Sequence, residues 1–118
     1  MLSFNTDQEY TADSFGSNSI GYAGLAKTLS SKDDLVLKRT APKPTSTFSG
    51  VSRTTSKLTR TMVLTGALQP LWDCILEVSA VIPVGAAAAD VEAMRDDLAA
   101  FIATSEFLES LQSQKISF

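Results

Sequence analysis

The apolar and polar residues follow two different periods on either side of Pro83. Between Leu71 and Ile82 every even position is apolar, while the odd positions include Asp73 and Glu77. A period of two predicts a β-strand with one buried face and one exposed face. From Ala87 to Thr104 the apolar residues recur three or four positions apart, which predicts an amphipathic helix.

A second, shorter helix is predicted directly after the first. Thr104 or Ser105 can cap its first turn, where Glu106 adds a favourable negative charge. Each predicted helix carries an apolar face that needs a surface to pack against. These faces consist of Val91, Met94, Leu98, Phe101 and Ile102 in the first helix and Phe107, Leu108 and Leu111 in the second.

The residues before Leu71 predict strands that are joined by turns. Segments 34–40 and 51–64 have the β-branched content of strands. An N-terminal hairpin is predicted, with a first strand that contains Leu2 and Phe4, a turn over 5–8 and a second strand over 9–12. Three further predictions are a strand over 20–29 loosened by Gly21 and Gly24, an extended connection or sheet edge at the prolines of 41–45, and a turn over 65–70.

The order of these elements, strands first and helices last, predicts an α+β protein. Two C-terminal helices would pack on one face of an antiparallel sheet and leave the other face free. The chain has 118 residues and 44% hydrophobic residues, which fits one globular domain over 1–118. A core of this size is often stabilised by oligomerisation.

Charge is distributed very unevenly along the chain. The formal net charge is −3, yet residues 35–72 contain no acidic residue. Six of the ten basic residues lie in this acid-free block, namely Lys38, Arg39, Lys43, Arg53, Lys57 and Arg60. A basic block in an acidic protein is typical of a surface that meets phosphate.

Strand alternation divides the acid-free block between two faces. Leu35, Leu37 and Leu58 are predicted to face the helices, with Cys74 as a buried thiol and Arg39 near the rim of that side. The free face would carry Lys38 and Thr40 from one strand and Arg53, Thr55, Lys57 and Thr59 from the next. Cations and hydroxyls in this arrangement suit phosphate and ribose groups. A solvent-exposed sheet face that is rich in lysine and threonine is the alternative interpretation.

The sequence lacks the residues that most catalytic and metal sites use. It has no histidine and a single cysteine, and no glycine-rich phosphate loop appears. Asp73 and Glu77 share a strand face but would lie roughly 13 Å apart, too far for paired-carboxylate catalysis. We therefore predict no enzyme activity, no cofactor, no metal and no small-molecule substrate. No segment fits a signal peptide or a membrane span, so a cytoplasmic protein is expected.

Four strings together make the chain similar to a known family. They are DLVLKRTAPKPT, FSGVSRTTSKLTRT, LWDCILEVSAVIP and VEAMRDDLAAFIATSEFLESL. In their order and content they resemble the coat proteins of single-stranded RNA bacteriophages, the leviviruses. The resemblance covers roughly residues 33–112, and the N-terminal hairpin fits it in kind.

The resemblance implies a fold and an assembly. An N-terminal hairpin would precede a five-stranded antiparallel sheet and two helices. Two chains would pair edge to edge into an intertwined dimer with one continuous sheet, and each chain's helices would clasp the partner through the eight apolar helix residues named above. Dimers would assemble into an icosahedral virion capsid in the cytoplasm of the bacterial host.

The resemblance also implies a partner for the free face. This face would line the shell interior and bind single-stranded RNA, often as a hairpin that represses translation. Carried over by strand position, the RNA-binding residues would be Lys38, Thr40, Arg53, Thr55, Lys57 and Thr59, with Lys43 as an outlier. The short turn over 65–70 departs from the family, and Asp73 and Glu77 are unfavourable near phosphate. Two other functions fit the same surface, a small dimeric nucleic-acid-binding regulator without a shell and an accessory subunit that docks an acidic protein.

Overall fold

The computed structural model describes residues 2–5 and 8–118, with the side chains of residues 2–8 left aside. The chain divides into two compact units, Met1–Val84 and Gly85–Phe118, and each is described by itself. The first unit holds all the strands, and the second holds both helices. The expectation of a single domain over 1–118 stays a prediction.

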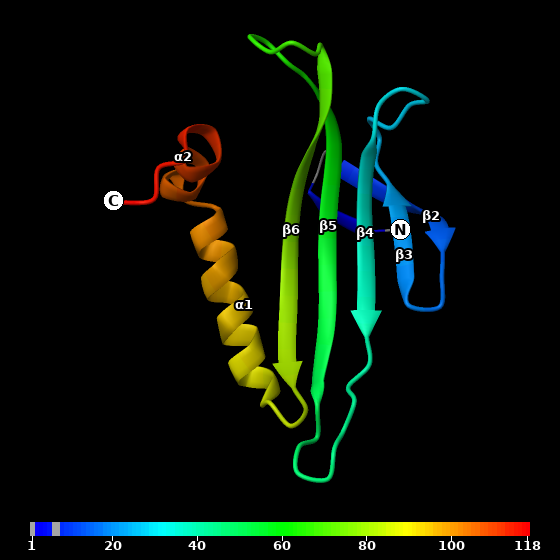
Figure 1. Ribbon diagram of the computed structural model, residues 1–118, viewed down its shortest axis with the longest axis vertical. Coiled ribbons are helices and arrows are strands. Elements are labelled where there is room, and N and C mark those ends of the chain that lie inside the picture. Colours follow the sequence, from blue (N-terminus) through cyan, green and yellow to red (C-terminus); the bar gives the residue numbers. More distant parts are fainter. Residues whose placement is uncertain (1, 6–7) are drawn as a thin grey trace. The chain divides into compact units, whose positions relative to one another are not determined.

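The strand unit is an open antiparallel sheet in which the strands follow one another in chain order (Figure 1). Strands β2 to β6 form a five-stranded sheet, and β1 extends it by pairing with β2. This confirms the predicted sheet of five strands with an N-terminal hairpin, and β2 belongs to both. The strands are β1 (Leu2–Asn5), β2 (Gln8–Phe15), β3 (Ser19–Ala23), β4 (Asp33–Thr40), β5 (Val51–Val63) and β6 (Leu71–Pro83).

The N-terminal hairpin is confirmed, although part of its predicted turn lies outside the described residues. Its second strand runs to Phe15, beyond the expected end at position 12, because β2 also pairs with β3. The strands expected over 34–40, 51–64 and 71–82 are found within one residue of those bounds. The prolines of 41–45 lie in a connection without regular structure, as expected.

The prediction of a strand over 20–29 is wrong beyond Ala23, where β3 ends. At Gly24 the chain turns, and the Gly24 N–H donates to the Asp33 carbonyl oxygen at 2.7 Å. A Cβ at this glycine would lie only 2.3 Å from Asp33 Oδ2. The close approach that Gly24 allows therefore ends the strand and begins the turn that leads to β4.

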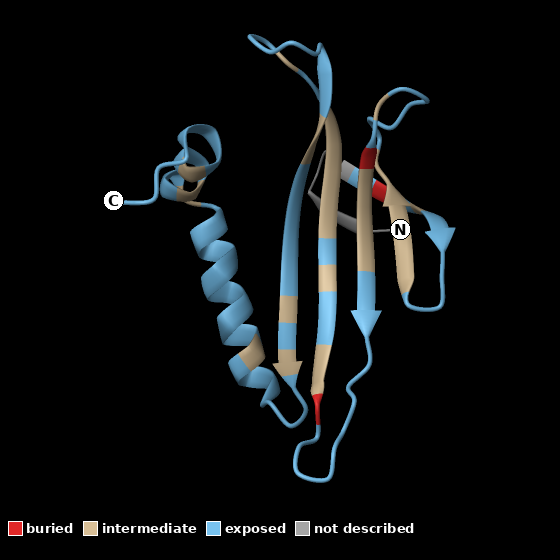
Figure 2. Ribbon diagram, in the orientation of Figure 1, coloured by how far each residue is buried: buried red, intermediate tan, exposed pale blue. Residues whose placement is uncertain are grey.

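The best-buried part of the strand unit is a polar cluster. Tyr10 is fully buried and Asp33 is 1% exposed, whereas Figure 2 shows that most of the strands are exposed or half-buried. Asp33 Oδ1 accepts hydrogen bonds from Tyr10 Oη at 3.2 Å and from Arg60 Nε at 3.1 Å. Arg60 Nη2 donates to Tyr10 Oη at 2.8 Å. The two hydrogen bonds that Arg60 donates, first the one to Tyr10 and then the one to Asp33, raise the pKa of its guanidinium above the ordinary value.

The helical unit confirms both predicted helices. Helix α1 spans Ala88–Ile102 and helix α2 spans Ser105–Ser113. Thr104 is the N-cap of α2, and its Oγ1 accepts a hydrogen bond from the Phe107 N–H at 3.3 Å, which leaves Ser105 as the first helical residue. Across the turn between the helices the rings of Phe101 and Phe107 meet edge to face, with centroids 5.5 Å apart. Packing of these helices on the sheet and the intertwined dimer stay predictions.

Candidate nucleic-acid interface

The strand register brings six of the seven predicted RNA-binding residues onto one face of the sheet. Thr40 of β4 lies opposite Arg53 of β5, and Lys38 lies opposite Thr55. Lys57 and Thr59 follow at two-residue steps along β5, so they point the same way. We call this side of the sheet the basic face. Lys38, Thr40 and Arg53 are exposed, and the other three are half-buried. Their role in RNA binding stays a prediction.

The seventh predicted residue, Lys43, lies beyond the end of β4 in the connection to β5. It lines a hollow together with Thr40 and Arg53, so it extends the basic face at that end. The hollow has a volume of about 230 Å³. Lys43 is therefore a neighbour of two of the other six predicted residues, Thr40 and Arg53.

The acidic residues of β6 lie on the same face. The register places Asp73 opposite Thr61 and Glu77 opposite Lys57. The negative charge of Asp73 is balanced by a lysine. Thr61 Oγ1 donates to Asp73 Oδ1 at 2.8 Å, and Lys32 Nζ lies 3.0 Å from Asp73 Oδ2. The hydrogen bond from Thr61 and then the contact with Lys32 lower the pKa of Asp73 below its ordinary value.

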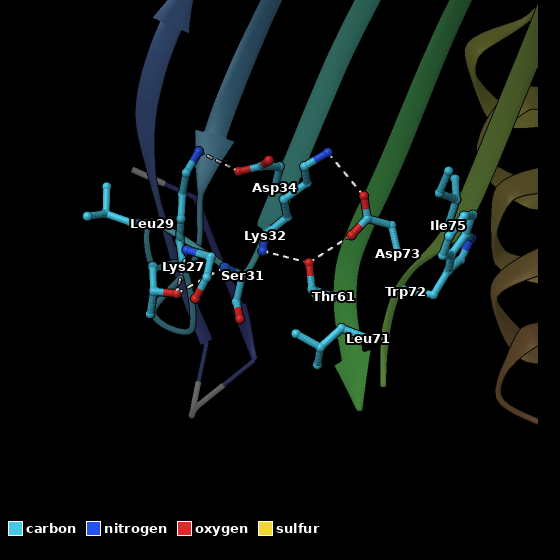
Figure 3. A pocket seen from close by; sticks show the side chains of 12 residues that line it. Lys27, Leu29, Ser31, Lys32, Asp34, Thr61, Leu71, Trp72, Asp73 and Ile75 are labelled. Atoms are coloured by element: carbon cyan, nitrogen blue, oxygen red, sulfur yellow. Dashed lines mark hydrogen bonds and ion pairs between the residues drawn. The ribbon is translucent and has the colours of Figure 1, made fainter. Parts of the chain in front are cut away.

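A third acid on the basic face, Asp34 at the start of β4, was not predicted from the sequence. Lys27 Nζ lies 2.8 Å from Asp34 Oδ1 and 3.2 Å from Asp13 Oδ2. These bonds, the one to Asp34 first, raise the pKa of Lys27 above its ordinary value. Figure 3 shows Lys27 pointing toward Asp34 and Lys32 pointing toward Asp73 around one hollow of about 700 Å³. The turn between β3 and β4 thus supplies the lysines that neutralise this end.

The opposite end of the basic face keeps its positive charge. Among the residues that the structure describes, Lys38, Lys43, Arg53 and Lys57 have no acid within ion-pair distance. The face is therefore polarised, neutral near the β3–β4 turn and cationic near the β4–β5 connection. Glu77 lies opposite Lys57 in the register, so the positive charge of this end is least compensated at Lys38, Lys43 and Arg53.

Two other bases of the acid-free block lie on the reverse side. The register places Arg39 opposite Thr54 and Arg60 opposite Cys74, on the side that also carries Leu37 and Leu58, as the strand alternation predicted. Arg39 Nη2 donates to the Ser17 carbonyl oxygen at 3.2 Å, and Arg60 is held in the polar cluster. Neither guanidinium belongs to the basic face.

The reverse side, which we call the apolar face, is incompletely buried in the single chain. Trp72, Leu76 and Val78 of β6 are 59%, 50% and 45% exposed. Cys74 is half-buried, so the prediction of a buried thiol is wrong for the single chain. Leu35, Leu37 and Leu58 are half-buried as well. β6 is also the last strand of the sheet, so its outer edge is unpaired.

The helix residues that were predicted to contact a second chain are available on the single chain. Met94, Leu98, Phe101, Ile102, Leu108 and Leu111 are between 40% and 69% exposed, and Val91 and Phe107 are half-buried. Neither helix contains a buried residue. Their function as a dimer interface stays a prediction.

No group of three or more histidine, cysteine, aspartate or glutamate side chains could hold a metal ion in residues 2–5 and 8–118. Within the same part of the chain neither helix is long and apolar enough to cross a membrane.

Comparisons with known proteins place the fold. No protein-family model and no curated protein sequence matches the chain. A chain of the virus-like particle of Beihai levi-like virus 32 matches with a TM-score of 0.82 at 15% identity, over 96% of this chain and 91% of that chain. One from the virus-like particle of Wenzhou levi-like virus 4 matches with a TM-score of 0.78 at 19% identity, over 98% and 81% of the two chains. The bacteriophage EMS014 coat protein matches with a TM-score of 0.60 at 16% identity, over 81% and 66%. The resemblance noted in the sequence is thus confirmed at the level of the fold.

Proposed function

We propose that this chain is a viral coat protein that forms dimers, assembles into a shell and packages single-stranded RNA. The observation that carries the proposal is the fold match over 96% of the chain to a chain of a levi-like virus-like particle. The charge pattern of the strand unit supports it independently, because a cationic sheet face suits a genome in the shell interior. The protein would then be located in the virion capsid, assembled in the bacterial host cytoplasm.

Dimer formation follows from surface that a single chain leaves exposed. The thirteen residues of β6 offer a long unpaired edge, a surface that natural proteins cover or pair. Pairing of two β6 edges would join two sheets into one and bring the exposed Trp72 and Leu76 of each chain close to its partner. Burial of such apolar surface contributes about 25 cal/mol per Å². We therefore expect an obligate dimer rather than a stable monomer.

The helices would complete this dimer by clasping the partner's sheet. Residues Met94, Leu98 and Phe101 share one side of α1 at helical spacing, and all three are at least 46% exposed. The apolar face of a second chain is a surface of matching chemistry. An intertwined arrangement would bury both faces at once.

RNA would bind at the cationic end of the basic face. Lys38, Arg53 and Lys57 would contact phosphates, while Thr40 and Thr55 would donate to phosphate or ribose oxygens. Lys27 and Lys32 would not take part, because Asp34 and Asp73 already occupy them. Contacts of this kind are sequence-independent, so general packaging is expected, and repression through a specific hairpin would be an additional activity.

Expression of the chain alone, followed by electron microscopy and measurement of co-purified nucleic acid, tests the proposal. We expect closed particles that contain RNA. Dimers that bind RNA without forming particles would instead indicate a small nucleic-acid-binding regulator. Particles or dimers without any affinity for RNA would favour a subunit whose basic face meets an acidic protein.

Neutralisation of two bases tests the assigned face. The double variant Arg53→Gln and Lys57→Gln should lower the RNA content and reduce the slope of log affinity against log salt by about 1.4, which corresponds to two lost phosphate contacts. A matched control is Arg95→Gln and Lys115→Gln, because both of these bases already lie beside acids in the helical unit. An equal loss of RNA in both double variants would refute the assignment.

A further inference from the structure

The connection between β4 and β5 makes close contacts at three points. Gly50 has φ of +92° and is buried, and a Cβ there would lie 2.9 Å from the Lys43 backbone nitrogen. The Gly50 carbonyl accepts a hydrogen bond from the Val84 N–H at 3.0 Å. Within the loop, Thr45 and Phe48 close a tight turn. The connection is therefore anchored at its base and again at its tip.

The turn at the tip determines where Phe48 lies. The Thr45 N–H donates to the Phe48 carbonyl oxygen at 2.7 Å, and the Phe48 N–H donates to Thr45 Oγ1 at 3.1 Å. Despite these two bonds, the side chain of Phe48 is 52% exposed. An aromatic ring that projects from a hydrogen-bonded turn and is open to solvent is suited to receive a flat partner.

Phe48 lines the same hollow as Lys43, Arg53 and Thr40. The hollow combines one aromatic ring, two cations and a hydroxyl, and the sequence around it contains no acid from residue 35 to residue 72. Its volume of about 230 Å³ is below the range of about 300–1,000 Å³ that is typical of sites for whole small-molecule ligands. A single planar group therefore fits better than a complete ligand.

We propose that this hollow binds one base of a single-stranded RNA. The base would stack on the Phe48 ring, while Lys43 and Arg53 would bind the phosphates on either side of the nucleotide. Thr40 would donate to a phosphate or ribose oxygen. The inference deepens the proposed function, since it takes RNA as the partner, and it adds an aromatic contact that charge alone does not predict.

Two probes separate stacking from charge. The first probe for binding titrations of the full chain is an oligoadenylate of about eight nucleotides, a length within the range that single-strand-binding domains cover. The second probe is inorganic polyphosphate, which has charge but no bases. Phe48→Ala should weaken oligoadenylate binding by about 5- to 150-fold, the range measured for loss of one stacked base. Its affinity for polyphosphate should stay within about twofold of the unsubstituted chain, because the phosphate ligands remain. Phe48→Trp should retain oligoadenylate binding.

Phe15→Ala provides a matched control, because Phe15 is also exposed, at 76%, but its register places it on the apolar face. This variant should bind both probes normally. If Phe48→Ala weakened the binding of both probes equally, or of neither, the stacking site would be overturned. RNA binding and particle formation by the unsubstituted chain would still support the proposed function in that case. Loss of particles with unchanged oligoadenylate binding would overturn the stacking site as well and indicate that Phe48 contacts another copy of the chain. Failure of the unsubstituted chain to bind either probe would refute the RNA partner itself.

Discussion

Replacement of Arg60 by methionine tests whether the buried polar cluster stabilises the strand unit. Methionine keeps much of the aliphatic length but removes the guanidinium from Asp33, whose side chain is 1% exposed. Among the described residues, the Asp33 side chain would retain hydrogen bonds from Tyr10 Oη at 3.2 Å and from the Ala26 N–H at 3.4 Å. A buried carboxylate would then lack its countercharge.

The magnitude follows from the geometry of the pair. Removal of one partner from a fully buried ion pair costs about 3–5 kcal/mol. The Arg60 side chain is 38% exposed, so water and salt screen it and reduce that value. We therefore expect a loss of about 2–3 kcal/mol in the free energy of unfolding. This corresponds to a decrease of about 1 M in the urea midpoint if the slope is about 2 kcal/mol per M.

Urea unfolding followed by circular dichroism, at one fixed protein concentration, measures this loss. The concentration must be fixed because the stability of a dimer depends on it. Arg39→Met is the matched control: it is an exposed arginine of the same acid-free block, and its loss should change stability by less than about 0.5 kcal/mol. A loss for Arg60→Met that is no larger than the loss for Arg39→Met would refute the role of the cluster.

Three further predictions concern other parts of the chain. Thr61 and then Lys32 lower the pKa of Asp73, so its contribution to stability is present above its ordinary pKa of 3.8 and is lost as pH falls through the lowered pKa. Asp73→Asn should therefore make the free energy of unfolding less dependent on pH in that range. In helix α1, Leu98→Glu should dissociate the proposed dimer in sedimentation experiments, while Ala93→Glu, on the opposite side of the helix, should not. Gly50→Ala should destabilise the chain by about 1–3 kcal/mol in urea, because its φ of +92° strains other residues and the Lys43 backbone leaves no space for a Cβ. Normal unfolding of that variant would contradict the anchored connection.

The basic face could be predicted from the sequence because alternation along a strand is a local property. Successive side chains point to opposite sides, so Arg53, Thr55 and Lys57 share a face wherever the strand lies. The pairing of β4 with β5 then places Lys38 and Thr40 beside them. Thr104 as a helix cap was likewise predictable, since a cap depends on its own first turn.

The sequence did not predict which charges of that face are paired, because the pairs join residues far apart in the chain. Lys32 reaches Asp73 only after β4, β5 and β6 have aligned. The end of β3 at Ala23 was also missed, because the contact between Gly24 and Asp33 that ends it forms only when the chain returns as β4.

Most of the elements, the faces of the strands and the acid-free block depend on near neighbours in the chain, so they could be predicted before folding was considered. Which charges remain available depends on the folded chain. It paired Asp34 and Asp73 with lysines of one turn, held Arg60 in a buried cluster and left Lys38, Lys43, Arg53 and Lys57 without acidic partners among the described residues. It also placed Phe48 beside two of those bases. Charge pairing acts over a few ångströms in space, a distance that only the folded chain defines.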